Sequence, residues 1–190
     1  MKYFLLWGVV TMVCLSCNPA TKDQLKAEAV TARPAGAHKQ VTASNKAFPA
    51  APVLNAYFKL GAALFAENAP IIAEAATALQ KELQAVRESA FPAAQQEIVR
   101  EIVEASIENA EHIAVNADNL KHQREHFQLL SNDLYDLVKT AGTGATVYKF
   151  VCPALNDHKG GSWLSNQQEL KNPYTGTGGN DCGTIDETLK

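Results

Sequence analysis

Two histidines and two cysteines in the second half of the chain are the residues best suited to chemistry. His122 and His126 are four residues apart, and on a helix this spacing places both imidazoles on the same side. Such a pair binds Zn(II) or Cu(II), but only weakly unless other ligands join it. Projection of the helix puts His126 at the edge of the apolar stripe and His122 further toward solvent. The pair is therefore a candidate metal site. The structural alternative is that His126 hydrogen-bonds to the C-terminal segment while His122 is solvated.

Cys152 and Cys182 enclose a segment that has too few periodic hydrophobic residues to form a core of its own. A disulfide between them is the favoured interpretation for an exported chain, and closing a loop of this length contributes about 3–4 kcal/mol in the chain-entropy model. Trp163 and Tyr174 are the expected anchors of this segment on the rest of the protein. The alternative is that both cysteines bind metal as thiolates, with His126 completing a soft site.

Catalysis by these groups has less support. An enzyme would use Cys152 as nucleophile and His126 or His158 as base, but neither local sequence resembles that of a thiol hydrolase, and we expect no enzymatic activity. Five glutamates at helical spacing suggest the carboxylates of a di-iron bundle, yet that site also needs Glu-x-x-His motifs on facing helices, which this pattern lacks. A solvated charged face is the expected role of these glutamates, which are Glu97, Glu101, Glu104, Glu108 and Glu111.

The first seventeen residues have the organisation of a bacterial lipoprotein leader. Lys2 supplies the positive charge, and residues 3–15 form an apolar run that is too short to span a bilayer. The run ends in Leu-Ser-Cys, and Cys17 is the expected lipidation site and mature N-terminus. An ordinary secretory signal cleaved nearby is the alternative. We therefore expect the protein in the cell envelope, held to the membrane by its N-terminal lipid on the periplasmic side or at the outer membrane.

The composition after the leader narrows the set of partners. Both methionines, Met1 and Met12, lie in the leader, so the predicted mature chain has none. Loss of Lys2 from the 17 basic side chains leaves 16 against 20 acidic ones, a net charge of -4. No basic face dominates, and nucleic acid is not an expected partner.

Three regions follow from the pattern along the chain. Residues 18–50 are rich in Ala, Thr, Lys and Pro and predict a flexible tether. Residues 51–190 predict one domain, in which apolar residues recur at helical spacing up to about residue 140, with breaks near residues 68, 90 and 117. The predicted fold class is all-α, an up-down four-helix bundle with a loop-rich, disulfide-closed C-terminal lobe at residues 145–190. Residues 145–151 are expected to be a short strand or extended segment.

Two stretches together resemble a known bacterial family. One is Gln-Arg-Glu-His-Phe at residues 123–127, followed by Leu130-Ser131. The other runs from Cys-Pro at 152–153, through Gly-Ser-Trp-Leu-Ser at 161–165 and Asn-Pro-Tyr-Thr-Gly at 172–176, to Cys-Gly at 182–183. On these motifs, residues 50–190 resemble domain of unknown function 3347. Its members are exported lipoproteins, or are fused to adaptor subunits of heavy-metal efflux systems of the copper and silver type.

The resemblance implies a periplasmic helical domain that handles copper or other heavy metals, with an efflux or other periplasmic protein as partner. One departure matters. The family usually has Cys-Pro-Met-Ala and another Met before the second cysteine, whereas this chain has Ala154 and no later Met. Thioether ligands select Cu(I). Because the predicted mature chain has no methionine, we expect no Met-based Cu(I) site in it.

The sequence leaves two possible functions. One is an accessory binding protein for copper or zinc, with His122, His126, Cys152 and Cys182 as candidate ligands. The other is a structural or interaction module without a metal.

Overall fold

The structure, a computed structural model, describes residues 49–179 and 182–190. The predicted leader (1–17), its lipidation site Cys17 and all but the last two residues of the predicted tether (18–50) lie outside the described residues. The description below therefore concerns the domain alone.

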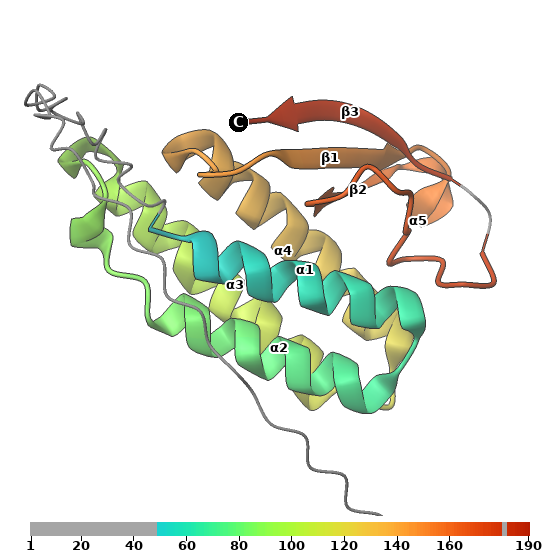
Figure 1. The fold of residues 1–190 in the computed structure, drawn as a ribbon. Helices are drawn as coiled ribbons and strands as arrows, with labels where there is room; N and C mark the ends of the chain where they lie inside the picture. Colours follow the sequence, from blue (N-terminus) through green and yellow to red (C-terminus); the bar gives the residue numbers. More distant parts are fainter. Residues whose placement is uncertain (1–48, 180–181) are drawn as a thin grey trace, which may run out of the picture. The chain divides into compact units, whose positions relative to one another are not determined.

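Four long helices make up most of the domain, as the hydrophobic spacing predicts (Figure 1). They are α1 (Ala51–Ala66), α2 (Ala69–Gln84), α3 (Gln96–Val115) and α4 (Leu120–Ala141), and two 3₁₀ turns, η1 (Glu88–Ala90) and η2 (Ala93–Gln95), lie between α2 and α3. Each helix packs against the one that follows it. No helix in residues 49–179 or 182–190 combines the length and hydrophobicity needed to cross a bilayer.

The helix ends follow from capping residues. Asn68 precedes α2 and Asn119 precedes α4, and each side-chain oxygen accepts a backbone N–H of the first turn, at 3.3 and 3.1 Å. Glu67 ends α1 in the left-handed conformation, and Gly142 ends α4 with φ of 85°. The sequence placed the break before α4 at residues 116–118, and the residue that caps the helix lies one position later.

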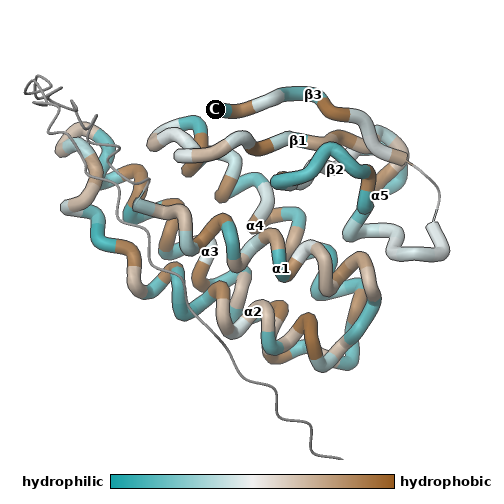
Figure 2. The backbone as a smooth tube through the Cα atoms, viewed as in Figure 1, coloured by the Kyte–Doolittle hydropathy of each residue, from teal (hydrophilic) through white to brown (hydrophobic). Residues whose placement is uncertain are grey.

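Each helix buries one apolar stripe, so that hydrophobic segments alternate with hydrophilic ones along the chain (Figure 2). Burial of one such side chain contributes roughly 1.5–3 kcal/mol. The largest fully buried side chains of the helices are Tyr57, Leu60, Leu64, Ile72, Leu79, Leu83, Ile113, Gln123, Phe127, Leu130, Leu134 and Leu137.

The C-terminal lobe is a three-stranded antiparallel sheet, so the all-α prediction is wrong for this part of the chain. Its strands are β1 (Val147–Cys152), β2 (Gly161–Ser165) and β3 (Thr184–Leu189), in the order β2-β1-β3. Phe150 of β1 pairs with Trp163 of β2 on one side and Ile185 of β3 on the other. The sequence of β3 did not predict a strand because most of its side chains are polar and exposed, and only pairing with β1 orders it.

A left-handed turn connects β1 to β2. Asn156, Asp157 and His158 have φ values of 52°, 54° and 65° within the short segment α5 (Leu155–His158). Asn and Asp tolerate this conformation better than most residues. The Asn156 side chain donates to the carbonyl oxygen of Gly160 at 2.8 Å, which closes the turn before β2.

A buried tyrosine hydroxyl joins the sheet to the helices. The N–H of Leu164 donates to the Tyr57 oxygen at 3.1 Å, and the Tyr57 hydroxyl donates in turn to Ser131 Oγ at 2.7 Å. The Ser131 hydroxyl in turn donates to the carbonyl oxygen of Phe127, also at 2.7 Å. Helices α1 and α4 and strand β2 are thus connected by one continuous row of hydrogen bonds.

Stacked aromatic rings reinforce this junction, and both predicted lobe anchors take part in it. Trp163 is buried and stacks on Phe150 with ring centroids 5.2 Å apart. Tyr174 contacts Trp163 edge-on at 6.0 Å and Phe127 at 5.7 Å, and its hydroxyl donates to the carbonyl oxygen of Ser162 at 2.7 Å. The hydroxyls of Tyr57 and Tyr174 therefore hydrogen-bond to backbone groups on the outer edge of β2. Burial raises the pKa of each hydroxyl well above its ordinary value.

We predict that Tyr57→Phe lowers the free energy of unfolding by about 1–3 kcal/mol, because it leaves the buried N–H of Leu164 without an acceptor. The measurement is urea unfolding followed by circular dichroism. Tyr148→Phe is the matched control, since among the described residues the Tyr148 hydroxyl has one hydrogen-bond partner, the exposed side chain of Gln168. Equal stability of both variants and the native protein would contradict the role given to the Tyr57 hydroxyl.

Candidate metal site

Three histidines converge at the end of the domain where α3 turns into α4. His112 lies on the last turns of α3, and His122 and His126 lie on the first two turns of α4. The connection of four residues (116–119) brings these turns to the same level. One ring nitrogen from each histidine lies within 4.8 Å of the other two, and all three side chains are half-buried. We call these residues the histidine cluster.

The three rings are arranged as one stacked pair and one edge-on neighbour. His112 stacks on His126 with centroids 4.3 Å apart and planes 10° from parallel. His122 meets His126 edge-on at 4.6 Å and 77°. Imidazole nitrogens are ligands for Zn(II), Cu(II) and Ni(II), so this cluster is the part of the described chain best suited to bind a cation.

One ring of the cluster is held by hydrogen bonds. His126 Nδ1 lies 2.9 Å from the side-chain oxygen of Asn109 on α3. The Asn109 amide nitrogen donates to Asp133 Oδ2 at 3.0 Å and to the carbonyl oxygen of Ala105 at 3.1 Å. His126 is therefore tied across the α3–α4 interface.

Burial and the neighbouring charges both favour the neutral form of His126. Burial is the main cause of its lowered pKa, and the neighbouring His112 and His122 lower it further because a second positive charge nearby is repelled. Glu125 and Glu108 act in the opposite direction more weakly. Burial also raises the pKa of the Asp133 carboxyl, against the hydrogen bond from Asn109. A neutral imidazole is the form that binds a metal ion.

The sequence identified two members of the cluster and missed the third. His122 and His126 lie together as their spacing predicts. His112 directly follows Glu111 and lies four residues after Glu108, so it lacks the Glu-x-x-His spacing of a di-iron site and was not a candidate. The available signal was the short break between the two helices. A tight antiparallel helix pair places residues equally far from the turn side by side, so His112 is level with the start of α4.

The alternative role predicted for His126 was a hydrogen bond to the C-terminal lobe, and it makes none with the lobe residues that the structure describes. Its partner is Asn109 on α3. Arg124, two residues earlier, makes the tie instead: its Nε donates to the carbonyl oxygen of Pro173 at 2.8 Å, and Nη2 contacts Glu67 Oε1 at 2.8 Å. A helix turns by 100° per residue, so neighbouring members of one motif face different partners.

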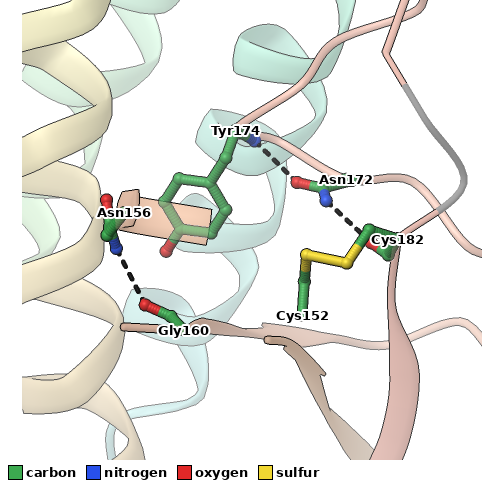
Figure 3. Close-up of a disulfide and its surroundings, with 6 residues drawn as sticks. All are labelled: Cys152, Asn156, Gly160, Asn172, Tyr174 and Cys182. Atoms are coloured by element: carbon green, nitrogen blue, oxygen red, sulfur yellow. Dashed lines mark hydrogen bonds between the residues drawn. A yellow bond between two sulfur atoms is a disulfide. The ribbon is translucent and has the colours of Figure 1, made fainter. Parts of the chain in front are cut away.

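Cys152 and Cys182 form a disulfide, with Cα atoms 5.3 Å apart (Figure 3). They therefore hold no thiolate for a metal, and the alternative in which they join His126 in a soft site is not what the structure contains. Asn172 supports the bridge by donating to the Cys182 carbonyl oxygen at 2.8 Å, and its own side-chain oxygen accepts the N–H of Tyr174 at 2.9 Å. The bridge connects the end of β1 to the residues just before β3.

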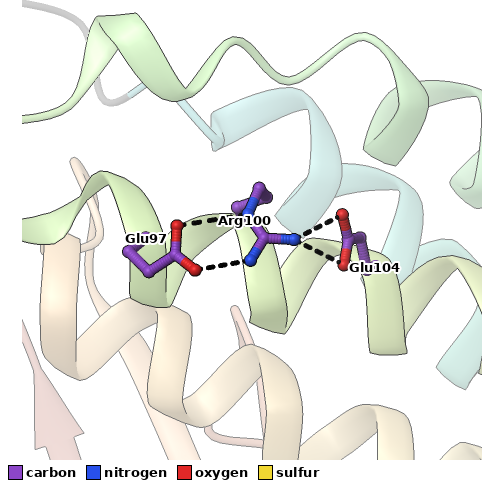
Figure 4. Close-up of polar contacts among 3 residues, drawn as sticks. All are labelled: Glu97, Arg100 and Glu104. Carbon is purple, nitrogen blue, oxygen red and sulfur yellow. Dashed lines mark hydrogen bonds and ion pairs between the residues drawn. The ribbon is translucent and has the colours of Figure 1, made fainter.

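The five glutamates of α3 are exposed, as expected for a solvated face. Arg100 lies between Glu97 and Glu104 and pairs with both, at 2.5 and 2.8 Å (Figure 4). The arginine holds the pKa of the Glu97 carboxyl below its usual range. Because these groups remain in water, their pairing adds little to stability.

The fold and the cluster define a helical domain that carries a disulfide-closed sheet and a surface group of three histidines. Residues 53–146 match the family described as "Protein of unknown function (DUF3347)". The chain belongs to this family, and the resemblance is confirmed over these residues, which contain the first of its two motifs but not the second. The match covers the four helices and ends just before β1. No curated protein and no solved structure matches the chain.

We predict that the metal-free domain loses stability as the pH falls below about 6.5, the ordinary pKa of histidine. His126 has a lowered pKa in the folded state, so the unfolded chain binds more protons between the two values, and protonation favours unfolding there. The loss levels off below the pKa of the folded state. Urea unfolding in the presence of a chelator, from pH 8 to 5.5, measures the slope.

The slope should shrink in His126→Gln, which keeps a polar side chain but cannot be protonated. His158→Asn is the matched control, because His158 is exposed and its left-handed backbone suits asparagine. An unchanged slope in His126→Gln would show that the cluster does not set the pH dependence.

We further predict that Cys152→Ala/Cys182→Ala lowers the free energy of unfolding by about 3–4 kcal/mol, because the disulfide constrains a long loop of the unfolded chain. Native protein kept in reductant should unfold at the same urea concentration as this double variant. A reductant that leaves the native midpoint unchanged would argue against the disulfide.

Proposed function

We propose that this chain is an exported, lipid-anchored accessory protein that binds a transition-metal cation and has no enzymatic activity. The observation that carries the proposal is the convergence of His112, His122 and His126 within 4.8 Å. The four helices serve in this proposal as an up-down four-helix bundle, whose α3–α4 end presents the cluster at the surface.

Three features of the sequence support the cellular setting of this proposal. The leader and Cys17 support export and anchoring by lipid on the periplasmic side or at the outer membrane. The disulfide is compatible with an oxidising compartment. The resemblance to domains fused to heavy-metal efflux adaptors supports a partner in metal handling. Because the thiols of Cys152 and Cys182 are oxidised, the proposal leaves no cysteine nucleophile in the described chain.

A second candidate is a structural or protein-interaction module without a metal. The observation that favours it is that several residues of the family-like motifs serve structural contacts. Arg124, Trp163 and Tyr174 hold the sheet on the helices, and Cys152 closes it. In this candidate function the histidine cluster only packs the helix ends.

Isothermal titration of the chain without its predicted leader, with Zn(II), Cu(II) and Cu(I) in turn, separates the two. We expect one site for Zn(II) or Cu(II) in the micromolar range or tighter. His112→Ala, His122→Ala and His126→Ala should each weaken binding at least about tenfold, which is 1.4 kcal/mol. His158→Asn should bind as the native protein does, because that histidine lies in the left-handed turn outside the cluster.

The redox state gives a further control. Binding should be equal before and after reduction of the disulfide if the ligands are the three imidazoles. Tighter binding after reduction would instead implicate Cys152 and Cys182. Absence of binding for all three cations in both redox states would retire the metal function in favour of the structural module.

A further inference from the structure

The histidine cluster has an internal division of roles. His126 Nδ1 is held at 2.9 Å by the Asn109 oxygen, and Asn109 is itself held by Asp133 at 3.0 Å and by the Ala105 carbonyl at 3.1 Å. Among the described residues, His112 has no comparable side-chain hydrogen bond, and His122 has only an exposed carboxylate, Glu125, at 3.6 Å.

The contacts of Asn109 determine which nitrogen of His126 carries the proton. The Ala105 carbonyl can only accept, so the Asn109 atom facing it is the amide nitrogen. The amide oxygen therefore faces His126, and since an amide oxygen also only accepts, Nδ1 of His126 must be the protonated nitrogen. In the neutral ring this leaves the lone pair on Nε2.

From this geometry we propose that the cluster is a three-imidazole site for Zn(II) or Cu(II), in which His126 is the fixed ligand through Nε2 and Asn109 and Asp133 are its positioning residues. This inference rests on the proposed function and adds the class of cation and the order among the ligands. The arrangement is the usual support of a metal-binding histidine, whose second nitrogen donates to a protein oxygen.

The ring geometry shows which ligands move. A lone pair lies in the plane of its ring, so the stacked His112 and His126 cannot both point at one ion as they lie, and His112 turns because His126 is held. Ligands around a tetrahedral zinc are about 3.3 Å apart for bonds of about 2.0–2.1 Å. One nitrogen of each ring already lies within 4.8 Å of the others, so distances between ligand atoms need to change by only about 1.5 Å, which side-chain rotation can supply.

The donor set selects the class of cation. Three nitrogens suit Zn(II) and Cu(II), whereas Cu(I) prefers thioether or thiolate sulfur. The described residues contain no methionine, and their two cysteines are joined to each other. Three side-chain ligands leave a fourth position of a tetrahedral ion for water or for a ligand from another molecule.

Nuclear magnetic resonance on the native protein without metal tests the tautomer directly. Long-range ¹H–¹⁵N correlation at pH 8 should show His126 protonated at Nδ1, with Nε2 bare, while the exposed His158 shows the Nε2–H form that free histidines favour. A bare Nδ1 on His126 would overturn the proposal without any variant.

Zinc titration of the chain without its predicted leader tests the positioning residues. Asn109→Ala should weaken binding by about 10- to 100-fold and shift the His126 tautomer, as loss of such a support does elsewhere. Asp133→Ala should have a smaller effect of the same direction, and Asp133→Asn should largely restore binding because it keeps an acceptor oxygen for Asn109. Asp136→Ala is the matched control on α4, since Asp136 is exposed and, among the described residues, makes no hydrogen bond to the cluster or to Asn109. Its charge has the weakest of the three effects on the pKa of Asp133.

The outcomes separate this inference from the proposed function. Native protein that binds zinc while Asn109→Ala binds equally well would overturn the positioning role and leave the metal function intact. Native protein that binds neither Zn(II) nor Cu(II) would overturn both. Circular dichroism shows whether each variant is folded. If Asn109→Ala does not fold, the tautomer of His126 in the native protein tests the positioning role instead.

Discussion

The hydroxyl of Tyr57 is the contact on which the arrangement of this domain depends. It accepts the outward-facing N–H of Leu164 and donates to Ser131, so that one buried group joins α1, α4 and β2. A strand edge left unpaired against the helices would be costly, since buried backbone groups need partners. Tyr174 completes the closure at Ser162. The sheet can lie on the helices because these polar groups match. Within the lobe, the disulfide joins the end of β1 to the segment before β3.

Helix α4 packs against both the sheet and α3, and the residues of its motif at 123–127 make contacts with both. Arg124 and Phe127 face the sheet side, where they contact the C-terminal lobe. Gln123 and His126 face α3, where the buried Gln123 amide donates to the Ile113 carbonyl at 2.9 Å and His126 contacts Asn109. The junction with the sheet and the histidine cluster are therefore built on adjacent faces of the same two turns. A change that shifts α4 would alter both.

Much of the helical part could be predicted from the sequence, because periodic apolar residues and capping asparagines act locally. Asn68, Asn119 and Gly142 mark helix ends through contacts within one turn. The sheet could not be predicted in the same way. The strand β3 has mostly exposed polar side chains, and it becomes a strand only when β1, more than thirty residues earlier, supplies its hydrogen bonds. The disulfide was predictable because only two cysteines follow the predicted leader, and such a pair is expected to be oxidised if the chain is exported.

The sequence by itself determined the family, the four helices and the proximity of His122 to His126, since each depends on local spacing or on a motif. It favoured the pairing of Cys152 with Cys182, which the structure then decided. Only the tertiary structure decided that His112 joins the pair, and that Asn109 and Asp133 hold His126. Those contacts cross from one helix to another, and they depend on how the α3–α4 turn aligns the two helices. Side chains brought together by packing leave no periodic signal in the chain, because their separation in sequence is set by the length of the connection between helices.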